Sequence, residues 1–218
     1  MKRLMKNIVL VLACASLLVG GASKASTNVV SETANYGPAT SDWTNSFVLQ
    51  QFNPALGSLQ SVFISAAEDI DVNGTVVNNK SSSANFKFQS GSLLTVTLPG
   101  LLGTLQPNPM GVVSTYKKLA GFASASYGPT QASGSANTLF TLPADMAWFT
   151  GTGTFSLPSF TQVQNLITGG GGKISPSLVT TASGSVRVEY TFITAVPEPA
   201  SLSLLVLGGA MLLLRKRR

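Results

Sequence analysis

The chain has 218 residues, with 14 basic side chains, 8 acidic side chains and no histidine. Eight of the basic residues lie within the first 25 or the last four positions, so residues 26–196 carry six basic residues against seven acidic ones. We therefore expect no basic surface for nucleic acid. Without histidine, and with Cys14 as the single cysteine, the region after residue 25 cannot form a Ser-His-Asp triad, a Cys-His dyad or a Cys/His zinc site. We expect one domain that is not an enzyme and needs no cofactor.

The N-terminal segment has the features of a secretory signal peptide. Residues 1–6 are cationic, residues 8–19 are apolar, and small residues stand three and one positions before a cleavage site between Ala25 and Ser26. The apolar run spans only about 18 Å as a helix, whereas the hydrocarbon of a bilayer is roughly 30 Å thick. We expect passage through the Sec translocon and removal of residues 1–25 by signal peptidase. Lipoprotein processing at Cys14 is the alternative, although few apolar residues would precede that cysteine.

Residues 26–194 repeatedly alternate apolar and polar side chains with period two, which is typical of half-buried β-strands. Turn-forming Gly, Pro and Asn residues separate the alternating segments. We predict strands at residues 47–52, 59–66, 85–89, 94–98, 112–124, 139–142, 153–157, 160–167 and 186–192. Many short strands at this spacing predict an all-β fold, an antiparallel β-sandwich of the jelly-roll-like or Ig-like kind, flanked by an N-terminal signal helix and a C-terminal hydrophobic helix.

The segment at residues 52–62, Phe-Asn-Pro-Ala-Leu-Gly-Ser-Leu-Gln-Ser-Val, resembles the Phe-Asp-Pro-x-Leu-Gly-Thr-Leu-x-x-Val signature of the choice-of-anchor E domain. Asn53 and Ser58 depart from that signature, and the rest of the domain aligns loosely. The motif needs no ligand. We expect its Pro and Gly to form a turn that points Phe52, Leu56, Leu59 and Val62 into the core.

Residues 69–74, Asp-Ile-Asp-Val-Asn-Gly, match the opening of a calcium loop, in which alternate side-chain oxygens and a glycine surround the ion. The twelfth position of such a loop should carry a closing Glu, but here it is Lys80. The alternative is a β-hairpin, because Asn73-Gly74 favours a type I′ turn. Calcium binding at Asp69 to Asn73 stays open.

Two further sets of side chains could carry function. Paired carboxylates could act as in a glycosidase, and an aromatic platform could stack on sugar rings, although core packing is the commoner fate of aromatic residues. The carboxylates are Glu68, Asp69, Asp71, Asp145 and Glu189, and the aromatic residues are Trp43, Tyr127, Trp148 and Phe149. The glycine run at residues 169–172 is expected to be a flexible connection, since the residue after Lys173 does not fit a phosphate loop.

The C-terminal residues have three parts in a fixed order: Pro197-Glu198-Pro199, an apolar run at residues 202–214, and the basic residues Arg215, Lys216, Arg217 and Arg218. The prolines favour an extended segment, and the apolar run is about 20 Å long as a helix. Terminal cations would stay on the cytoplasmic side and stop transfer.

This arrangement resembles the PEP-CTERM sorting signal of Gram-negative bacteria. The resemblance implies that exosortase, a membrane-embedded cysteine transpeptidase, recognises Pro197, Glu198 and Pro199 and cleaves there. The alternative is a tail anchor that is never processed.

These observations divide the chain into a signal peptide (residues 1–25), a choice-of-anchor E-like β-sandwich domain (residues 26–194) and a sorting signal (residues 195–218). We expect an exported protein, held transiently in the inner membrane and then released to the cell envelope or extracellular matrix. Family resemblance implies an association with exopolysaccharide and biofilm. A carbohydrate-binding module that recognises matrix polysaccharide is the second hypothesis.

Overall fold

A computed structural model describes residues 25–40, 42–113 and 117–194 of the chain. By contacts the chain divides into two compact units. The larger unit, Val29–Phe192, contains the core described below. Of the smaller unit, residues 25–28 and 193–194 are described, and here the backbone amide of Thr194 donates a hydrogen bond of 3.2 Å to the carbonyl oxygen of Ser26.

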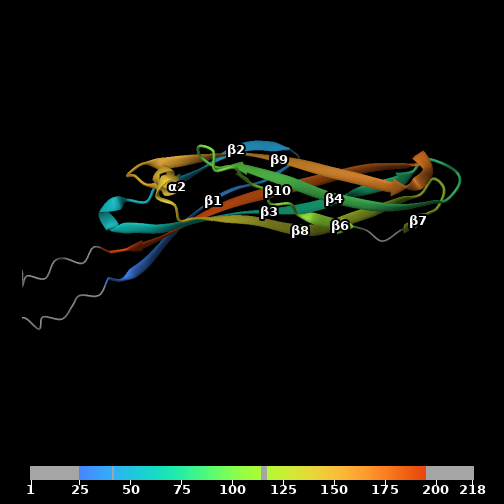
Figure 1. Cartoon of the computed structure of the whole chain (residues 1–218). Helices are drawn as coiled ribbons and strands as arrows, with labels where there is room; N and C mark the ends of the chain where they lie inside the picture. Colours follow the sequence, from blue (N-terminus) through green and yellow to red (C-terminus); the bar gives the residue numbers. More distant parts are fainter. Residues whose placement is uncertain (1–24, 41, 114–116, 195–218) are drawn as a thin grey trace, which may run out of the picture. The chain divides into compact units, whose positions relative to one another are not determined.

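The larger unit is built from two β-sheets that face each other (Figure 1). Sheet A has the strand order β1 (Thr27–Thr40), β10 (Ile174–Ile193), β3 (Ser58–Asn78) and β8 (Ser124–Phe140). Sheet B has the order β2 (Trp43–Gln50), β9 (Thr154–Gly169), β4 (Ala84–Thr97) and β5 (Thr104–Leu105), and β6 (Met110–Val113) and β7 (Lys117–Leu119) also pair with β4. The pairings of β3 with β8, of β2 with β9 and of β4 with β9, β5, β6 and β7 are antiparallel. The expected all-β antiparallel sandwich is confirmed.

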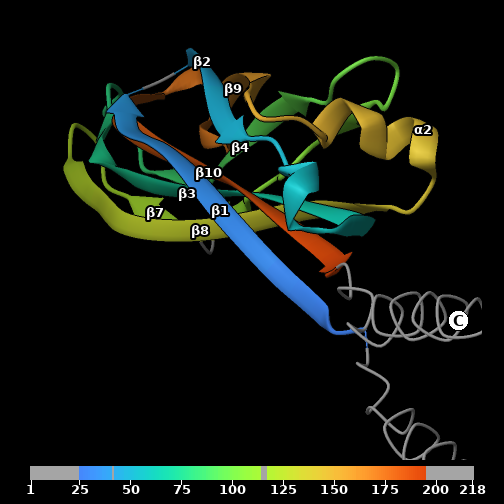
Figure 2. The same ribbon diagram turned by 90° about the vertical axis from the view of Figure 1, so that its left-hand side faces the viewer.

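Four short helices connect strands within the described residues. They are η1 (Pro54–Leu56), α2 (Pro143–Met146), η2 (Ala147–Phe149) and η3 (Gly170–Gly172). Figure 1 shows α2 and the cyan helix η1 at the same end of the sandwich, and this end faces the viewer in Figure 2. The glycine run is thus the connection between β9 and β10, as expected, and positive φ angles at Gly170, Gly171 and Gly172 explain why glycine fills it.

The core lies between the inner faces of the two sheets, where the period-two alternation places the apolar side chains. Val186, Val188, Tyr190 and Phe192 of β10 are all buried, while Arg187 between them is exposed. Sheet B contributes aromatic and aliphatic side chains from β2, β4 and β9 to the same cluster: Trp43, Phe47, Leu49, Phe88, Leu94, Val96, Phe155 and Leu157. Burying such side chains stabilises the fold by roughly 1.5–3 kcal/mol each relative to exposure.

Several strands differ in length from the sequence prediction. The predicted segments 153–157 and 160–167 form one strand, β9, because Pro158 lies where β9 pairs only with β2 and the pairing with β4 starts at Ser159. A missing amide at that position costs no ladder hydrogen bond to β4. The predicted strand at residues 112–124 was wrong as a single element, because β6 and β7 pair separately with β4 and the chain turns before β8 begins at Ser124.

The predicted hairpin at Asn73-Gly74 was also wrong. Strand β3 continues through this dipeptide to Asn78, and its register with β8 shifts between Val72 and Gly74, which marks a β-bulge. Gly74 is required there because a Cβ atom would lie 2.1 Å from the carbonyl oxygen of Ser177. The segment is extended, so it does not curl into a calcium loop either.

The two edge strands of sheet A carry the same tripeptide, Tyr-Gly-Pro, at residues 36–38 in β1 and 127–129 in β8. Both Gly-Pro peptide bonds are cis, and Gly37 and Gly128 have φ angles of 92° and 87°. Tyr36 packs on Trp43 and Tyr127 packs on Phe88, with ring centroids 4.5 Å and 4.6 Å apart. Each edge strand therefore turns an aromatic ring toward sheet B.

The segment at residues 52–62 contains the short helix η1, a turn at Gly57 and the start of β3, which agrees in part with the prediction. Asn53 caps η1 by accepting a 3.0 Å hydrogen bond from the amide of Ala55, and Gly57 has a φ angle of 147°. Phe52 and Val62 are buried as expected. The expectation for Leu56 was wrong, because this side chain lies on η1 facing solvent with 48% of its surface exposed.

Candidate functional site

A groove of about 390 Å³ runs across sheet A and receives residues from all four of its strands. Its polar side chains alternate with inward-pointing core residues, so the period of two that builds the core also builds the groove. The lining residues are Pro38 of β1, Asp69, Ile70 and Asp71 of β3, Gln131, Ala132 and Ser133 of β8, and Thr181 and Ser183 of β10.

Asp69 and Asp71 give the groove its charge, because residues two apart on a strand project from the same face. The amide of Gln131 donates a 3.3 Å hydrogen bond to Oδ2 of Asp71, while Oδ1 of Asp71 is shielded from solvent and has no hydrogen-bond partner. Two carboxylates, an amide and hydroxyl groups can together accept and donate hydrogen bonds to a polyhydroxylated ligand. Within the described part of the chain, no three His, Cys, Asp or Glu residues come together as a metal site would need.

Of the five carboxylates singled out from the sequence, Asp69 and Asp71 line the groove, whereas Glu68, Asp145 and Glu189 do not. Glu68 projects into the core and is fully buried, whereas its neighbour Asp69 lies on the opposite face of sheet A. Asp69 and Asp71 lie on one strand and project in one direction, whereas a glycosidase places its two carboxyl groups on either side of the scissile bond. Of the five carboxylates, Asp69 and Asp71 are the pair that lines the groove.

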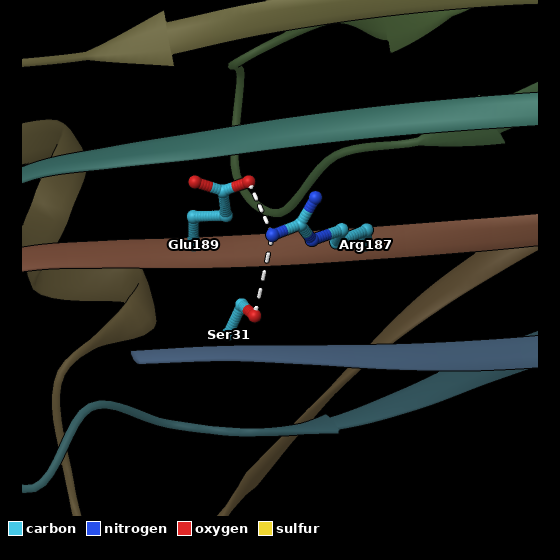
Figure 3. A network of polar contacts seen from close by, with 3 residues as sticks. All are labelled: Ser31, Arg187 and Glu189. Atoms are coloured by element: carbon cyan, nitrogen blue, oxygen red, sulfur yellow. Dashed lines mark hydrogen bonds and ion pairs between the residues drawn. The ribbon is translucent and has the colours of Figure 1, made fainter. Parts of the chain in front are cut away.

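Glu189 is held in an ion pair away from the groove lining. Its Oε1 lies 2.7 Å from the guanidinium of Arg187, which also donates a 3.4 Å hydrogen bond to the hydroxyl of Ser31 on β1 (Figure 3). The arginine thus bridges β10 and β1. Because half of its side chain is exposed, this pair contributes little to stability.

The buried Glu68 contacts sheet B. The hydroxyl of Thr161 on β9 donates a 2.9 Å hydrogen bond to Oε1 of Glu68, and its Oε2 has no partner. Burial raises the pKa of Glu68 above its ordinary value, and the hydrogen bond from Thr161 opposes that shift. Glu68 is therefore a structural carboxyl group of the core, which period-two alternation with Ala66 and Ile70 could have indicated.

The four aromatic residues do not form a platform. Trp43, Tyr127 and Phe149 are buried in the core, with 0–8% of their surface exposed. Trp148 alone is half exposed, and its ring lies against Gly100, where a Cβ atom would approach the ring to 2.8 Å. A stacking surface would have to use Trp148 by itself.

The predicted processing sites are described only in part. Ala25 and Ser26 are exposed, and Ser26 is bonded to Thr194 as given above. The residues of the predicted exosortase box, Pro197, Glu198 and Pro199, and the basic tail, Arg215, Lys216, Arg217 and Arg218, lie outside the described residues. In the part of the chain that is described, none of the helices combines the length and the apolar character that a bilayer crossing requires.

Sequence reasoning found the acidic half of the groove but missed the remainder. Gln131, Thr181 and Ser183 stand in polar stretches that resemble many others in this Ser/Thr-rich chain. Only the strand order, which places β10 and β8 on either side of β3, brings them beside Asp69 and Asp71.

No family model matches this chain. The comparison with curated proteins likewise found no relative. Among solved structures, a chain from the work described as "Bacillus endospore appendages form a novel family of disulfide-linked pili" is 10% identical over 79% of this chain and 96% of that chain, with a TM-score of 0.19. A chain of infectious bursal disease virus Gx strain is 10% identical over 88% of this chain and 49% of its own length, with a TM-score of 0.24. Turnip Yellow Mosaic Virus gives 9% identity over 80% of this chain and 98% of that chain, with a TM-score of 0.19.

Proposed function

We propose that the chain is an exported, non-catalytic surface or extracellular-matrix protein of a Gram-negative bacterium, sorted and processed by exosortase. The observation that carries this proposal is the order Pro-Glu-Pro, apolar run and basic tail at residues 197–218, preceded by a signal peptide at residues 1–25. Before processing the protein would be held in the inner membrane by its C-terminal helix, and the processed product would reach the envelope or matrix, in association with exopolysaccharide.

The backbone contact between Ser26 and Thr194 supports these boundaries. Ser26 would be the first residue after signal peptidase cleavage. Thr194 is the last residue before the proposed sorting signal, which begins at Ala195. Because β1 begins at Thr27 and β10 ends at Ile193, removal of both end segments would leave every β-strand of the domain intact.

We further propose that the sandwich is of the jelly-roll-like rather than the Ig-like kind. Strands β1, β2, β3 and β4 alternate between sheets A and B, and so do β8, β9 and β10. Repeated crossing between two facing sheets, here of four and six strands, is typical of a jelly roll.

Intact mass of the envelope-associated protein tests the sorting proposal. We expect the wild-type chain to begin at Ser26 and to lack the residues after the Pro-Glu-Pro box, provided that exosortase is present. Glu198→Gln should retain the full tail, whereas the matched variant Ser201→Ala, outside the box, should be trimmed as the wild type is. Wild-type protein that keeps its tail in an exosortase-positive strain would overturn the proposal.

The groove on sheet A favours a second candidate function, a carbohydrate-binding module for matrix polysaccharide. Its hydroxyl, amide and carboxylate groups suit a neutral sugar, because they can both donate and accept hydrogen bonds. Binding on a glycan array that is lost in Asp71→Asn but kept in Asp145→Asn would support a ligand in the groove. Loss in Trp148→Ala instead would place the ligand at the half-exposed indole, and no saturable ligand would leave the protein a structural role.

A further inference from the structure

Five lysines that are scattered along the sequence gather at one end of the sandwich. They are Lys80 between β3 and β4, Lys87 on β4, Lys117 and Lys118 on β7, and Lys173 after η3. In Figure 1, β7 and the orange helix η3 lie at the end opposite to α2. We call these five residues the lysine end.

Backbone contacts join the segments that carry these lysines. The amide of Asn79 donates to the carbonyl oxygen of Lys173 (2.8 Å), and the amide of Phe122 donates to that of Lys80 (2.9 Å). Lys117 pairs across the strands with Phe86, which on its other side pairs with Gly169. Lys118 pairs with Asn85, so it is a diagonal neighbour of Lys87 on the outer face of sheet B.

The positive charge of the lysine end has no acidic counterpart. Residues 78–90, 117–125 and 166–176, which form this end, contain no Asp or Glu. Among the residues that the structure describes, the one ion pair joins Arg187 and Glu189, which lie elsewhere. Residues 26–194 therefore have a near-zero total charge but are strongly polarised, with every lysine at one end.

Side-chain contacts order the loops of the lysine end. The buried amide of Asn78 donates to the carbonyl oxygens of Ser82 (2.9 Å), Ala120 (2.9 Å) and Leu119 (3.3 Å), which ties the β3–β4 connection to the segment after β7. Nζ of Lys173 donates to the hydroxyl of Ser82 at 2.8 Å. These bonds hold together the loops that carry Lys80 and Lys173.

An aromatic side chain projects from the same surface. Phe122 is 72% exposed and has a φ angle of 58°, which is unusual for a residue other than glycine. Such a backbone persists only where its surroundings impose it, and here the bond to Lys80 and the close packing of Gly121 against Ser81 do so. The exposed ring offers a flat apolar face beside the lysines.

We propose that the lysine end binds an acidic polysaccharide, with the lysine ammonium groups contacting its carboxylates and Phe122 packing on a sugar ring. Charge complementarity selects an anionic polymer, and several separated lysines suit a flexible chain better than one planar anion. A neutral glycan, as considered for the groove, would not use this charge.

The test measures retention of the full chain, in uncharged detergent micelles, on beads carrying polygalacturonate, dextran or phosphatidylglycerol. We expect retention on polygalacturonate at low salt, release as salt rises, and none on dextran. Replacing Lys80, Lys87, Lys117 and Lys118 by Gln should weaken retention at least tenfold, and Phe122→Ala should weaken it severalfold. Arg187→Gln, which also removes one cation, should change it less than twofold.

Each outcome decides the proposal. Unchanged retention in the lysine variant, with an unaltered thermal midpoint as evidence of folding, would overturn it. So would retention on phosphatidylglycerol beads as strong as on polygalacturonate, which would assign the lysine end to an anionic membrane. The location of the protein at the matrix rests on the proposed export, whereas binding to polysaccharide in vitro does not. Failure of tail processing would appear in the intact-mass experiment, and failure of polysaccharide binding would appear in the bead experiment.

Discussion

The hydroxyl of Thr161 on sheet B donates a 2.9 Å hydrogen bond to the carboxyl group of Glu68 on sheet A. Both residues are fully buried, so a polar contact joins the two layers inside the core. Because burial raises the pKa of Glu68, the folded protein holds this group protonated to a higher pH than the unfolded chain does. The stability of the domain should therefore depend on pH through this residue.

We expect the contribution of Glu68 to the free energy of unfolding to fall as pH rises from about 4.5 to its raised pKa. Above that pKa the contribution should no longer change. The reason is that the unfolded chain releases the proton first. Glu68→Gln cannot ionise, so its stability relative to wild type should increase across the same window. Urea unfolding at several pH values measures this difference, and parallel pH profiles for the two proteins would contradict it.

Gly37→Ala should destabilise the domain by more than about 1 kcal/mol. At the φ angle of 92° an L side chain is strained, and its Cβ would lie 2.7 Å from the carbonyl oxygen of Ala182 on the neighbouring strand. Gly153→Ala is a matched control, because its Cβ would meet nothing closer than 3.5 Å. Thermal unfolding compares the two, and an equal loss in both variants would show that the edge-strand geometry is not the cause.

Asn78→Ala should cost about 2–3 kcal/mol, since it removes the donor from the buried carbonyl oxygen of Leu119 and also breaks the bonds to Ser82 and Ala120. It should also raise hydrogen exchange in the loops of the lysine end and weaken retention on polygalacturonate. Asn79→Ala serves as the control, because its exposed side chain bonds only the hydroxyl of Ser175. Equal effects of the two substitutions would contradict a specific role for Asn78.

Tyr190→Phe should destabilise the domain by about 1 kcal/mol. The phenol of Tyr190 on sheet A donates a 2.7 Å hydrogen bond to the carbonyl oxygen of Gln50 at the end of β2 in sheet B. Removing the hydroxyl leaves that oxygen without its donor but keeps the ring in the core. Denaturant unfolding measures the loss, and a variant as stable as wild type would mean that the oxygen finds solvent instead.

Local pattern predicted much of the fold, since strand alternation depends on residues close in sequence. The inward positions of β4 and β10 were predicted correctly, because a single buried face imposes a period of two. The prediction failed at Asn73-Gly74, where the same dipeptide that favours a hairpin turn can also form a bulge. Which of the two forms depends on the strands that lie alongside, here β8 and β10.

The sequence by itself determined the all-β class, the inward faces of the strands, the lack of residues for common catalytic groups, and the end segments that predict export. Only the tertiary structure decided which polar residues meet. Strand order places Thr181 and Ser183 in the same groove as Asp69 and Asp71. Strand pairing and loop hydrogen bonds place Lys118 and Lys173 at the same end of the domain as Lys80. Net charge and composition are sums over the chain, whereas a surface depends on where folding places each charge.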